Sequence, residues 1–272
     1  MNKALYFFIL AALLTACKSK PAQQQPAKAA VPAKQTSLLK KLVHIYEGVW
    51  VKTDYFEKVR ETKSVLAAVD KVVGVSGLVI DSNLLLADTL RVEVGWDNQN
   101  PGAMVLRDKP GKNPNSLLFD DAELGYEITG GDTALILYQI YNQQLFKTRY
   151  NRILPVNPDG NLSNALDYAI NKTLMAGKYQ LLAGGKTTLV TFTADGTVSG
   201  LPGHGKYFIE KELKPGPFKN LDLITFDEYS NKKAVYTYVF KGDELLLYDA
   251  KPDAKNKVMV MGQLKYTLKH IN

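Results

Sequence analysis

Two segments of the chain, 37–47 and 161–176, carry apolar residues at the spacing of an amphipathic helix. Ser37 is suited to cap the first segment, because a serine hydroxyl accepts a hydrogen bond from a backbone N–H of the first helical turn. In each case a glycine and an aromatic residue then open an apolar segment, as Gly48-Val49-Trp50 and Gly177-Lys178-Tyr179. We therefore predict a short helix followed by a strand at both places.

The later parts of the two halves also match. A Gly-Asp pair, Gly131-Asp132 in one half and Gly242-Asp243 in the other, precedes a Leu-rich strand and then a last strand. Between the halves, residues 154–160 contain prolines and a glycine, which is typical of a linker. The pattern predicts one module used twice, over 37–155 and 161–272.

Alternation of apolar and polar residues predicts antiparallel strands with one solvated face. In 258–268 the apolar face would carry Val258, Val260, Leu264, Tyr266 and Leu268. In 235–241 the aromatic face would carry Tyr236, Tyr238 and Phe240. Further strands of the first module are predicted over 78–80, 84–86, 90–94, 103–106 and 125–128.

One segment of the first module departs from this strand pattern. After a strand predicted over 51–55, residues 58–73 carry apolar positions near helical spacing. We predict an inserted helix there, for which Ser64 is a suitable start. The second module has only the short segment 183–185 in its place.

A short helix, a Gly-x-Trp motif and a small antiparallel barrel together resemble the lipocalin-like superfamily. Gly48-Val49-Trp50 carries the likeness in the first module, whereas Gly177-Lys178-Tyr179 has Tyr in place of Trp. Residues 192–200 and 238–248 resemble the short lipocalin-like domains of bacterial lipoproteins. The resemblance implies a mainly β protein of two small antiparallel β-barrels in tandem, each preceded by a short helix. It also implies that Trp50 closes the bottom of its barrel by packing.

Aromatic residues supply the candidates for closing a barrel or facing a ligand. These candidates are Trp50, Tyr138, Tyr179, Tyr236, Tyr238, Phe240 and Tyr248. One interpretation is core and cross-strand packing. The other is the wall of an apolar pocket with a few polar tips. Both stay open, because each module is shorter than a typical lipocalin and a short barrel can be filled by its own side chains.

The first residues of the chain have the composition of a signal peptide. Lys3 precedes an uncharged apolar run over 4–14, which is shorter than the ~20 residues that a membrane-spanning helix needs. The motif Leu14-Thr15-Ala16-Cys17 then resembles the lipobox of bacterial lipoproteins, and its cysteine is the only one in the chain. This resemblance implies transfer of a diacylglyceryl group to the thiol, cleavage before the cysteine and acylation of the new amine. We therefore expect a signal peptide over 1–16 and a lipid anchor in the membrane.

Residues 17–36 follow as an expected lipidated tether. Pro, Ala, Gln and Lys dominate this segment, so it has too little apolar surface to offset the entropy of ordering. Lys18 stands where Asp retains such lipoproteins in the inner membrane, which favours the outer membrane. The absence of an acidic cluster after Cys17 favours the periplasmic face over the cell surface.

Composition narrows the classes of partner. The chain has a net charge of +7 and is 46% hydrophobic, which is enough for a real core. With no second cysteine it cannot form an internal disulfide, so the fold rests on burial. An exported protein with scattered lysines is not expected to bind nucleic acid. Its positive surface is either simply solvated or attracted to anionic lipid or glycan.

The chain offers little recognisable chemistry. His44, His204 and His270 lack the spacing of a zinc helix, and the part of the chain that carries them has no cysteine. Asp120 and Asp121 are neighbours, so on a strand they would point to opposite faces. We expect no metal, no other cofactor and no enzymatic activity.

Three hypotheses for function follow. In the first, the barrels of an envelope lipoprotein bind a hydrophobic small molecule or an envelope component. In the second, filled barrels present a surface to an envelope protein. In the third, the protein is an envelope hydrolase in which His204 meets a carboxylate and a nucleophile in one cleft.

Overall fold

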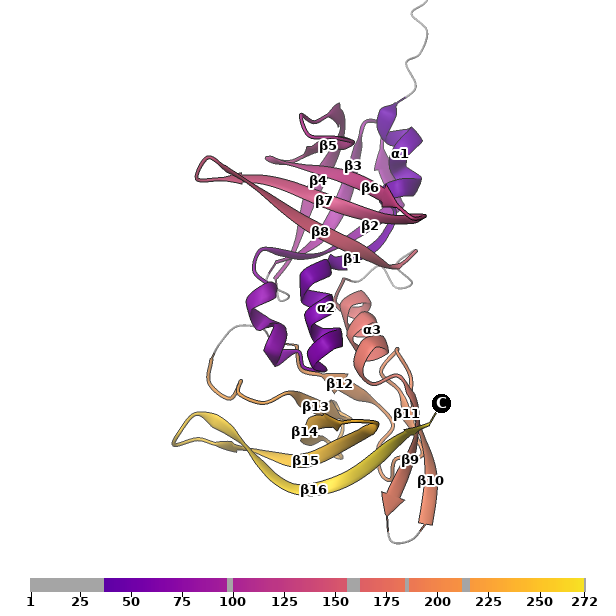
Figure 1. Ribbon diagram of the computed structural model, residues 1–272, viewed down its shortest axis with the longest axis vertical. Helices are drawn as coiled ribbons and strands as arrows, with labels where there is room; N and C mark the ends of the chain where they lie inside the picture. The colour runs from indigo at the N-terminus through magenta and orange to yellow at the C-terminus, as the bar shows by residue number, and fades with distance from the viewer. Residues whose placement is uncertain (1–36, 97–99, 156–161, 184–185, 212–215, 272) are drawn as a thin grey trace, which may run out of the picture. The chain divides into compact units, whose positions relative to one another are not determined.

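The computed structural model describes residues 37–271 apart from 97–99, 156–161, 184–185 and 212–215 (Figure 1). The expected signal peptide, Cys17, the tether and most of the expected linker lie outside the described residues. Residues Thr36–Asn272 form one compact unit. Within it the protein is mainly β, as predicted, with two eight-stranded antiparallel sheets in tandem.

The first sheet is a closed barrel whose strands follow one another in chain order. The helix α1 (Leu38–Tyr46) precedes it, and the Ser37 hydroxyl accepts a hydrogen bond from the Lys40 N–H at 3.2 Å, as expected of a cap. The strands are β1 (Gly48–Lys52), β2 (Val75–Leu86), β3 (Thr89–Trp96), β4 (Asn100–Pro110), β5 (Ser116–Phe119), β6 (Ala122–Thr129), β7 (Asp132–Tyr141) and β8 (Gln144–Leu154). Pairing of β1 with β8 closes the barrel.

The second sheet is nearly closed. The helix α3 (Leu162–Leu174) precedes it, and pairing of its first and last strands joins the two ends of the module. The strands are β9 (Gly177–Ala183), β10 (Lys186–Phe192), β11 (Val198–Ser199), β12 (Tyr207–Ile209), β13 (Leu223–Phe226), β14 (Ala234–Lys241), β15 (Glu244–Asp253) and β16 (Val258–Ile271). A seam lies between β11 and β12, where Thr197 and Lys206 form an isolated bridge.

The insert between β1 and β2 differs from its prediction. Instead of one helix over 58–73 it forms α2 (Thr53–Thr62) and the 3₁₀ helix η1 (Leu66–Lys71). The strand predicted over 51–55 is wrong beyond Lys52, because α2 begins at the next residue. Lys63 ends α2 in the left-handed conformation at φ 56°. Ser64 starts the next turn, and its hydroxyl accepts a hydrogen bond from the Ala67 N–H at 2.9 Å.

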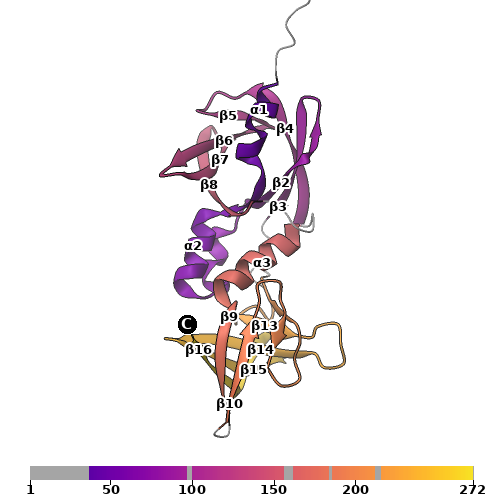
Figure 2. The same ribbon diagram turned by 90° about the vertical axis from the view of Figure 1, so that its right-hand side faces the viewer.

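This insert supplies core residues to the second barrel, although it lies in the sequence of the first. Figures 1 and 2 both show α2 and α3 between the two sheets. One buried apolar cluster joins the interior of the second sheet to side chains of α2, of η1 and of the two residues that flank η1: Tyr55, Val59, Val65, Ala68 and Val72. The same cluster contains Leu166, Ile170 and Leu174 of α3. The first barrel has a separate core cluster of its own.

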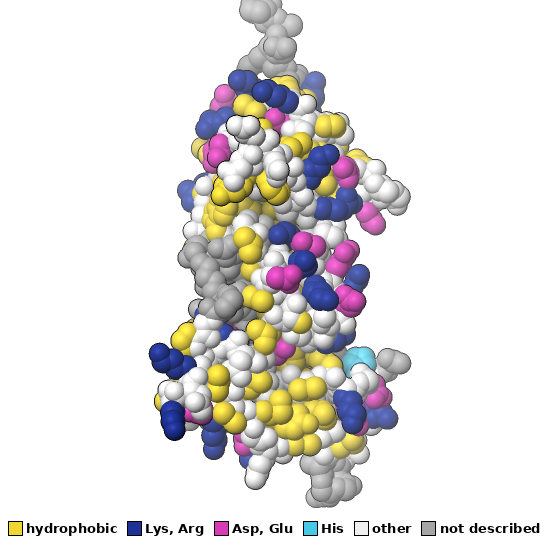
Figure 3. Space-filling model, turned by 60° about the vertical axis from the view of Figure 1, so that its left-hand side comes forward, with side chains coloured by type: hydrophobic (Ala, Val, Ile, Leu, Met, Phe, Trp, Pro, Cys, Tyr) yellow, Lys and Arg dark blue, Asp and Glu magenta, His cyan; other side chains and the backbone are white. Residues whose placement is uncertain are grey.

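The last strand also departs from regular alternation. Val260 and Leu264, predicted on the apolar face, are both 48% exposed, whereas Met259 is buried. The pairing of β15 with β16 shifts register around Tyr248, and such bulges exchange the faces of the residues beyond them. In the view of Figure 3, hydrophobic side chains gather on the surface in the half of the molecule that carries the second sheet.

Candidate functional site

The interior of the first barrel is filled by its own side chains. Many of them expose no surface to water: Trp50, Leu78, Leu90, Val92, Val94, Leu106, Phe119, Leu124, Leu135, Leu137 and Tyr150. A hollow interior would leave the side chains around it accessible to a water molecule. The described part of this barrel therefore resembles the packed core of a small barrel more than a ligand cavity.

The second barrel is filled in the same way. Its fully buried side chains are Val190, Ile224, Phe226, Leu245, Leu247 and Leu268. The helices α2 and α3 add to this core from the side that faces the first barrel. The apolar interior is thus occupied by protein.

Trp50 and Tyr179 occupy equivalent places in the two modules. Trp50 Nε1 donates a hydrogen bond to the carbonyl of Tyr46 at 2.7 Å, and Tyr179 Oη donates to the carbonyl of Met175 at 2.9 Å. Each aromatic side chain therefore satisfies a carbonyl four residues earlier, near the end of the preceding helix.

The last strand of each module completes this arrangement. Arg152 pairs with Trp50 across β8 and β1, and its guanidinium lies 4.4 Å from the indole centroid. His270 pairs with Tyr179 across β16 and β9, and the two rings meet edge to face at 5.1 Å. Glycine is required at position 48, where β1 meets β8, since a Cβ there would lie 2.7 Å from the carbonyl oxygen of Leu154.

The other aromatic candidates do not share one site. Tyr138 lies in the first barrel, is 5% exposed, and has Lys147 Nζ 5.7 Å from its ring centroid. Tyr236 and Tyr238 are buried in the second barrel, whereas Phe240 and Tyr248 are half-buried. Tyr236 packs against Phe226 and Tyr266, and Tyr238 against Phe240. The structure places Tyr236, Tyr238 and Phe240 in contact with other aromatic rings of the second module.

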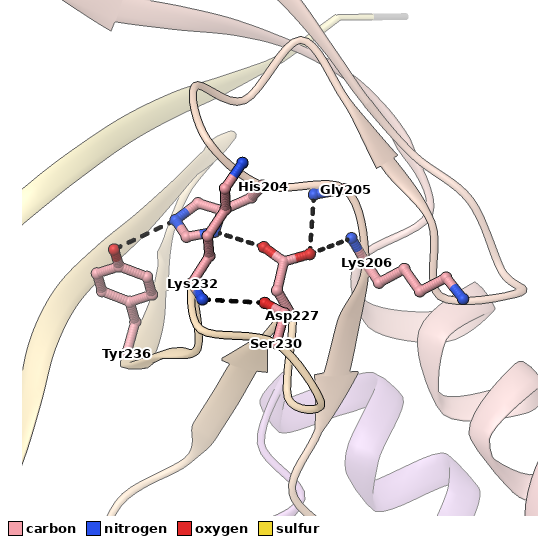
Figure 4. A network of polar contacts seen from close by, with 7 residues as sticks. All are labelled: His204, Gly205, Lys206, Asp227, Ser230, Lys232 and Tyr236. Carbon is pink, nitrogen blue, oxygen red and sulfur yellow. Dashed lines mark hydrogen bonds and ion pairs between the residues drawn. The ribbon is translucent and has the colours of Figure 1, made fainter.

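His204 lies in a polar network in the second module (Figure 4). Its Nδ1 is 2.9 Å from Asp227 Oδ2, and its Nε2 is 3.4 Å from the hydroxyl of Tyr236. Burial opposes ionisation of Asp227, but hydrogen bonds from His204 and from the backbone N–H groups of Lys206 and Gly205 hold its pKa below the ordinary value. Burial raises the pKa of Tyr236 to about 12. Asp227 thus holds the segment from His204 to Lys206 in place, and the other ring nitrogen of His204 faces Tyr236 on β14.

A carboxylate in the first barrel holds a loop in a similar way. Glu123 on β6 accepts hydrogen bonds from the backbone N–H groups of Lys112 and Asn113 at 2.9 and 2.8 Å. The Ser116 hydroxyl donates to it at 2.7 Å. Burial alone would raise its pKa, but these donors outweigh burial and lower the pKa to about 2. Glu123 and Asp227 are therefore positioned as loop anchors.

Asp120 and Asp222 each have partners of their own and do not share a site. Asp120 lies in the turn between β5 and β6 and is 3.8 Å from Arg107. Asp222 accepts hydrogen bonds from the Ser64 hydroxyl at 2.6 Å and from the Leu66 N–H at 2.9 Å, so it ties the insert to the second module. No group of three or more metal-ligating side chains occurs among the residues that the structure describes.

A pocket of about 470 Å³ lies outside the barrel interiors, between α2 and α3. Val51 of β1 and Asn151 and Ile153 of β8 also line it. The two helices contribute Phe56, Glu57, Arg60, Tyr168, Ala169, Lys172 and Thr173, and Lys63 at the end of α2 completes the lining. We call this site the interhelical groove. Its volume is within the range of roughly 300–1,000 Å³ that small-molecule sites occupy.

Comparison with known proteins gives no relative: no family model, curated protein or solved structure matches the chain. Within the described ranges, no helix has both the length and the apolar character needed to span a membrane.

The interhelical groove and the two loop anchors were not predicted. The anchors depend on contacts between residues far apart in the chain, and single carboxylates on alternating strands give no signal of them. The helical spacing of Phe56, Arg60 and Lys63 could have marked one wall of the groove. The opposite wall comes from the other module, so no local pattern joins the two.

Proposed function

We propose that this protein is a non-catalytic lipoprotein of the bacterial envelope, anchored in the outer membrane through Cys17. In this proposal two lipocalin-like barrels, filled by their own side chains and by those of the helices beside the second barrel, act as a rigid body that presents a surface to an envelope protein. The single observation that carries the proposal is the filled interior of both barrels. A barrel packed at core density favours a structural or interaction role over storage of a ligand inside it.

The hairpin of β7 and β8 is the surface that best fits a protein partner. Its tip residues Asn142 and Gln143 both have positive φ, as in the tight turns that hairpins prefer. Just behind the tip, exposed apolar side chains gather: Ile140 at 77%, Tyr141 at 68%, Leu145 at 48% and Phe146 at 49%. An exposed apolar cluster on one short element is typical of an interaction site.

Photo-crosslinking in intact cells tests the interaction. A crosslinking amino acid at Tyr141 is expected to capture an envelope protein, while the same amino acid at exposed Asp132, at the other end of β7, is expected to capture none. Equal capture at both positions, or none at Tyr141, would count against a docking role for the hairpin.

The anchor is tested separately by labelling cells with an alkyne analogue of palmitate. The unmodified chain is expected to carry the label and the Cys17→Ala variant to lack it. Label retained by Cys17→Ala would disprove anchoring at this residue without bearing on the hairpin.

A further inference from the structure

The interhelical groove has an apolar end and a cationic end. Both helices run from the first sheet towards the second, because α2 follows β1 directly and α3 precedes β9 (Figures 1 and 2). Val51, Ile153 and Phe56 lie where the groove meets the first barrel. Arg60, Lys63 and Lys172 come later along the two helices. The lining therefore changes from hydrocarbon to positive charge along the groove.

The cations of the groove outnumber the acidic side chains of its lining. Between described residues, no ion pair involves Arg60, Lys63 or Lys172, and Glu57 is the only acidic side chain that the lining contains. A basic residue in the last turn of a helix stabilises that helix by itself. That effect accounts for one cation on each helix, but it does not require that cations from two different helices line one groove.

We propose that the interhelical groove binds an anionic amphiphile, a molecule with a hydrocarbon part and a carboxylate or phosphate head. Its hydrocarbon would lie on the half-buried side chains of Phe56 and Ile153, and its head would face Arg60, Lys63 and Lys172. Apolar contact supplies most of the affinity in such a site, and the cations fix the orientation.

This ligand site is distinct from the barrel interiors and from the β7–β8 hairpin. The inference goes beyond the proposed function and is independent of it. A partner captured at the hairpin would leave the groove untested, and an empty groove would leave the hairpin unaffected.

Calorimetric titration of the compact unit Thr36–Asn272 with dodecanoate, below its micelle concentration, tests the proposal. Dodecanol, with the same chain and no charge, and inorganic phosphate, with charge and no chain, are the comparison ligands. We expect dodecanoate to bind more tightly than either. Replacing two cations in Arg60→Gln/Lys172→Gln is expected to weaken dodecanoate by about fivefold and to leave dodecanol unchanged.

Two further variants separate binding from folding. Asn151 is an exposed residue of β8 that lines the groove. The Asn151→Trp variant is expected to fill the groove with its indole and abolish binding of dodecanoate. Lys41→Gln, which removes an exposed helical lysine of α1, is the matched control and is expected to bind normally. Absence of dodecanoate binding, equal binding of dodecanoate and dodecanol, phosphate binding as tight as that of dodecanoate, or unchanged binding in Asn151→Trp would each overturn the proposal. A circular dichroism spectrum of each variant establishes that it is folded.

Discussion

The two barrels start from the same plan and complete it in different ways. Each has a helix, a Gly-x-aromatic strand and eight antiparallel strands in chain order. The first closes fully through β1 and β8 and has a core cluster of its own. The second keeps a seam between β11 and β12 and shares its core cluster with α2, η1 and α3.

The difference shows how a barrel with an incomplete sheet can still be filled. Short strands such as β11 and β12 contribute few inward side chains, so part of the apolar interior must be covered by other elements. Each buried Val or Leu side chain contributes about 1.5–3 kcal/mol, which makes the helical insert a substantial part of the second core. The second barrel thereby depends on residues encoded within the first.

The substitution with the largest expected effect tests whether the second barrel depends on the insert. Val59→Asp on α2 places a carboxylate in the shared core and is expected to lower the free energy of unfolding by about 3–5 kcal/mol. Hydrogen exchange should show lost protection in the strands of the second sheet, while the first barrel stays protected. Glu57→Asp, at an exposed position on the same helix, is the control. Loss of protection in the first barrel alone would contradict the dependence.

A second comparison concerns the equivalent aromatic residues. Trp50→Phe leaves the Tyr46 carbonyl without its donor and removes ring surface beneath Arg152, so we expect a loss of about 2–3 kcal/mol. Tyr179→Phe removes only the hydroxyl bonded to Met175 and should cost about 1 kcal/mol. Urea unfolding of both variants measures the difference. If Tyr179→Phe lowered the free energy of unfolding as much as Trp50→Phe does, the two aromatic residues would contribute equally, contrary to this prediction.

Loop anchoring by Glu123 predicts a dependence on pH. The pKa of this carboxyl is about 2 in the folded protein and near 4.5 in the unfolded chain, so its contribution to stability is present above pH 4.5. Falling pH removes the contribution between these two values. We expect Glu123→Gln to lower the free energy of unfolding by about 1–2 kcal/mol at pH 7, allowing for solvent screening.

The measurement is urea unfolding of Glu123→Gln and the unmodified chain between pH 7 and pH 2. The difference between the two proteins should shrink as the pH falls below about 4.5. Glu127→Gln, on the same strand but in an exposed ion pair with Arg149, is the control. A difference that did not change with pH would rule out the ionised carboxylate as the source of the stability.

The smallest expected effect concerns the contact between Ser64 and Asp222. Ser64→Ala should cost about 1 kcal/mol, and a double-mutant cycle with Asp222→Asn should give a coupling of about 0.5–1.5 kcal/mol. Ser82→Ala, which removes a similar hydrogen bond to Glu47, is matched but lies within the first module. It should leave hydrogen exchange in the second sheet unchanged. Zero coupling between Ser64 and Asp222 would mean that this contact does not link the insert to the second module.

Much of the fold follows from local patterns. The helical spacing after Ser37, the Gly-x-aromatic openings and the Gly-Asp turns each predict an element that the structure contains. Gly130, Gly131 and Gly242 take positive φ in those turns, which glycine adopts without strain. The mainly β class and the tandem barrels are confirmed.

The predictions that failed depend on contacts between distant residues. Apolar residues of the insert look the same whether they cover the first barrel or the second. The bulge near Tyr248 shifts β16 against β15, and alternation within β16 alone gives no sign of the shift. The interhelical groove likewise has one wall in each module.

By itself, the sequence determined most of the succession of helices and strands and the repeat, because propensity, period and residue type act over a few neighbouring positions. It also carries the expectation of a lipid anchor at Cys17. Only the tertiary structure decided that the barrels are filled, that the insert completes the second core and that two helices enclose the interhelical groove. Filling depends on how side chains from strands and helices far apart in the chain meet, and that is a property of packing in space.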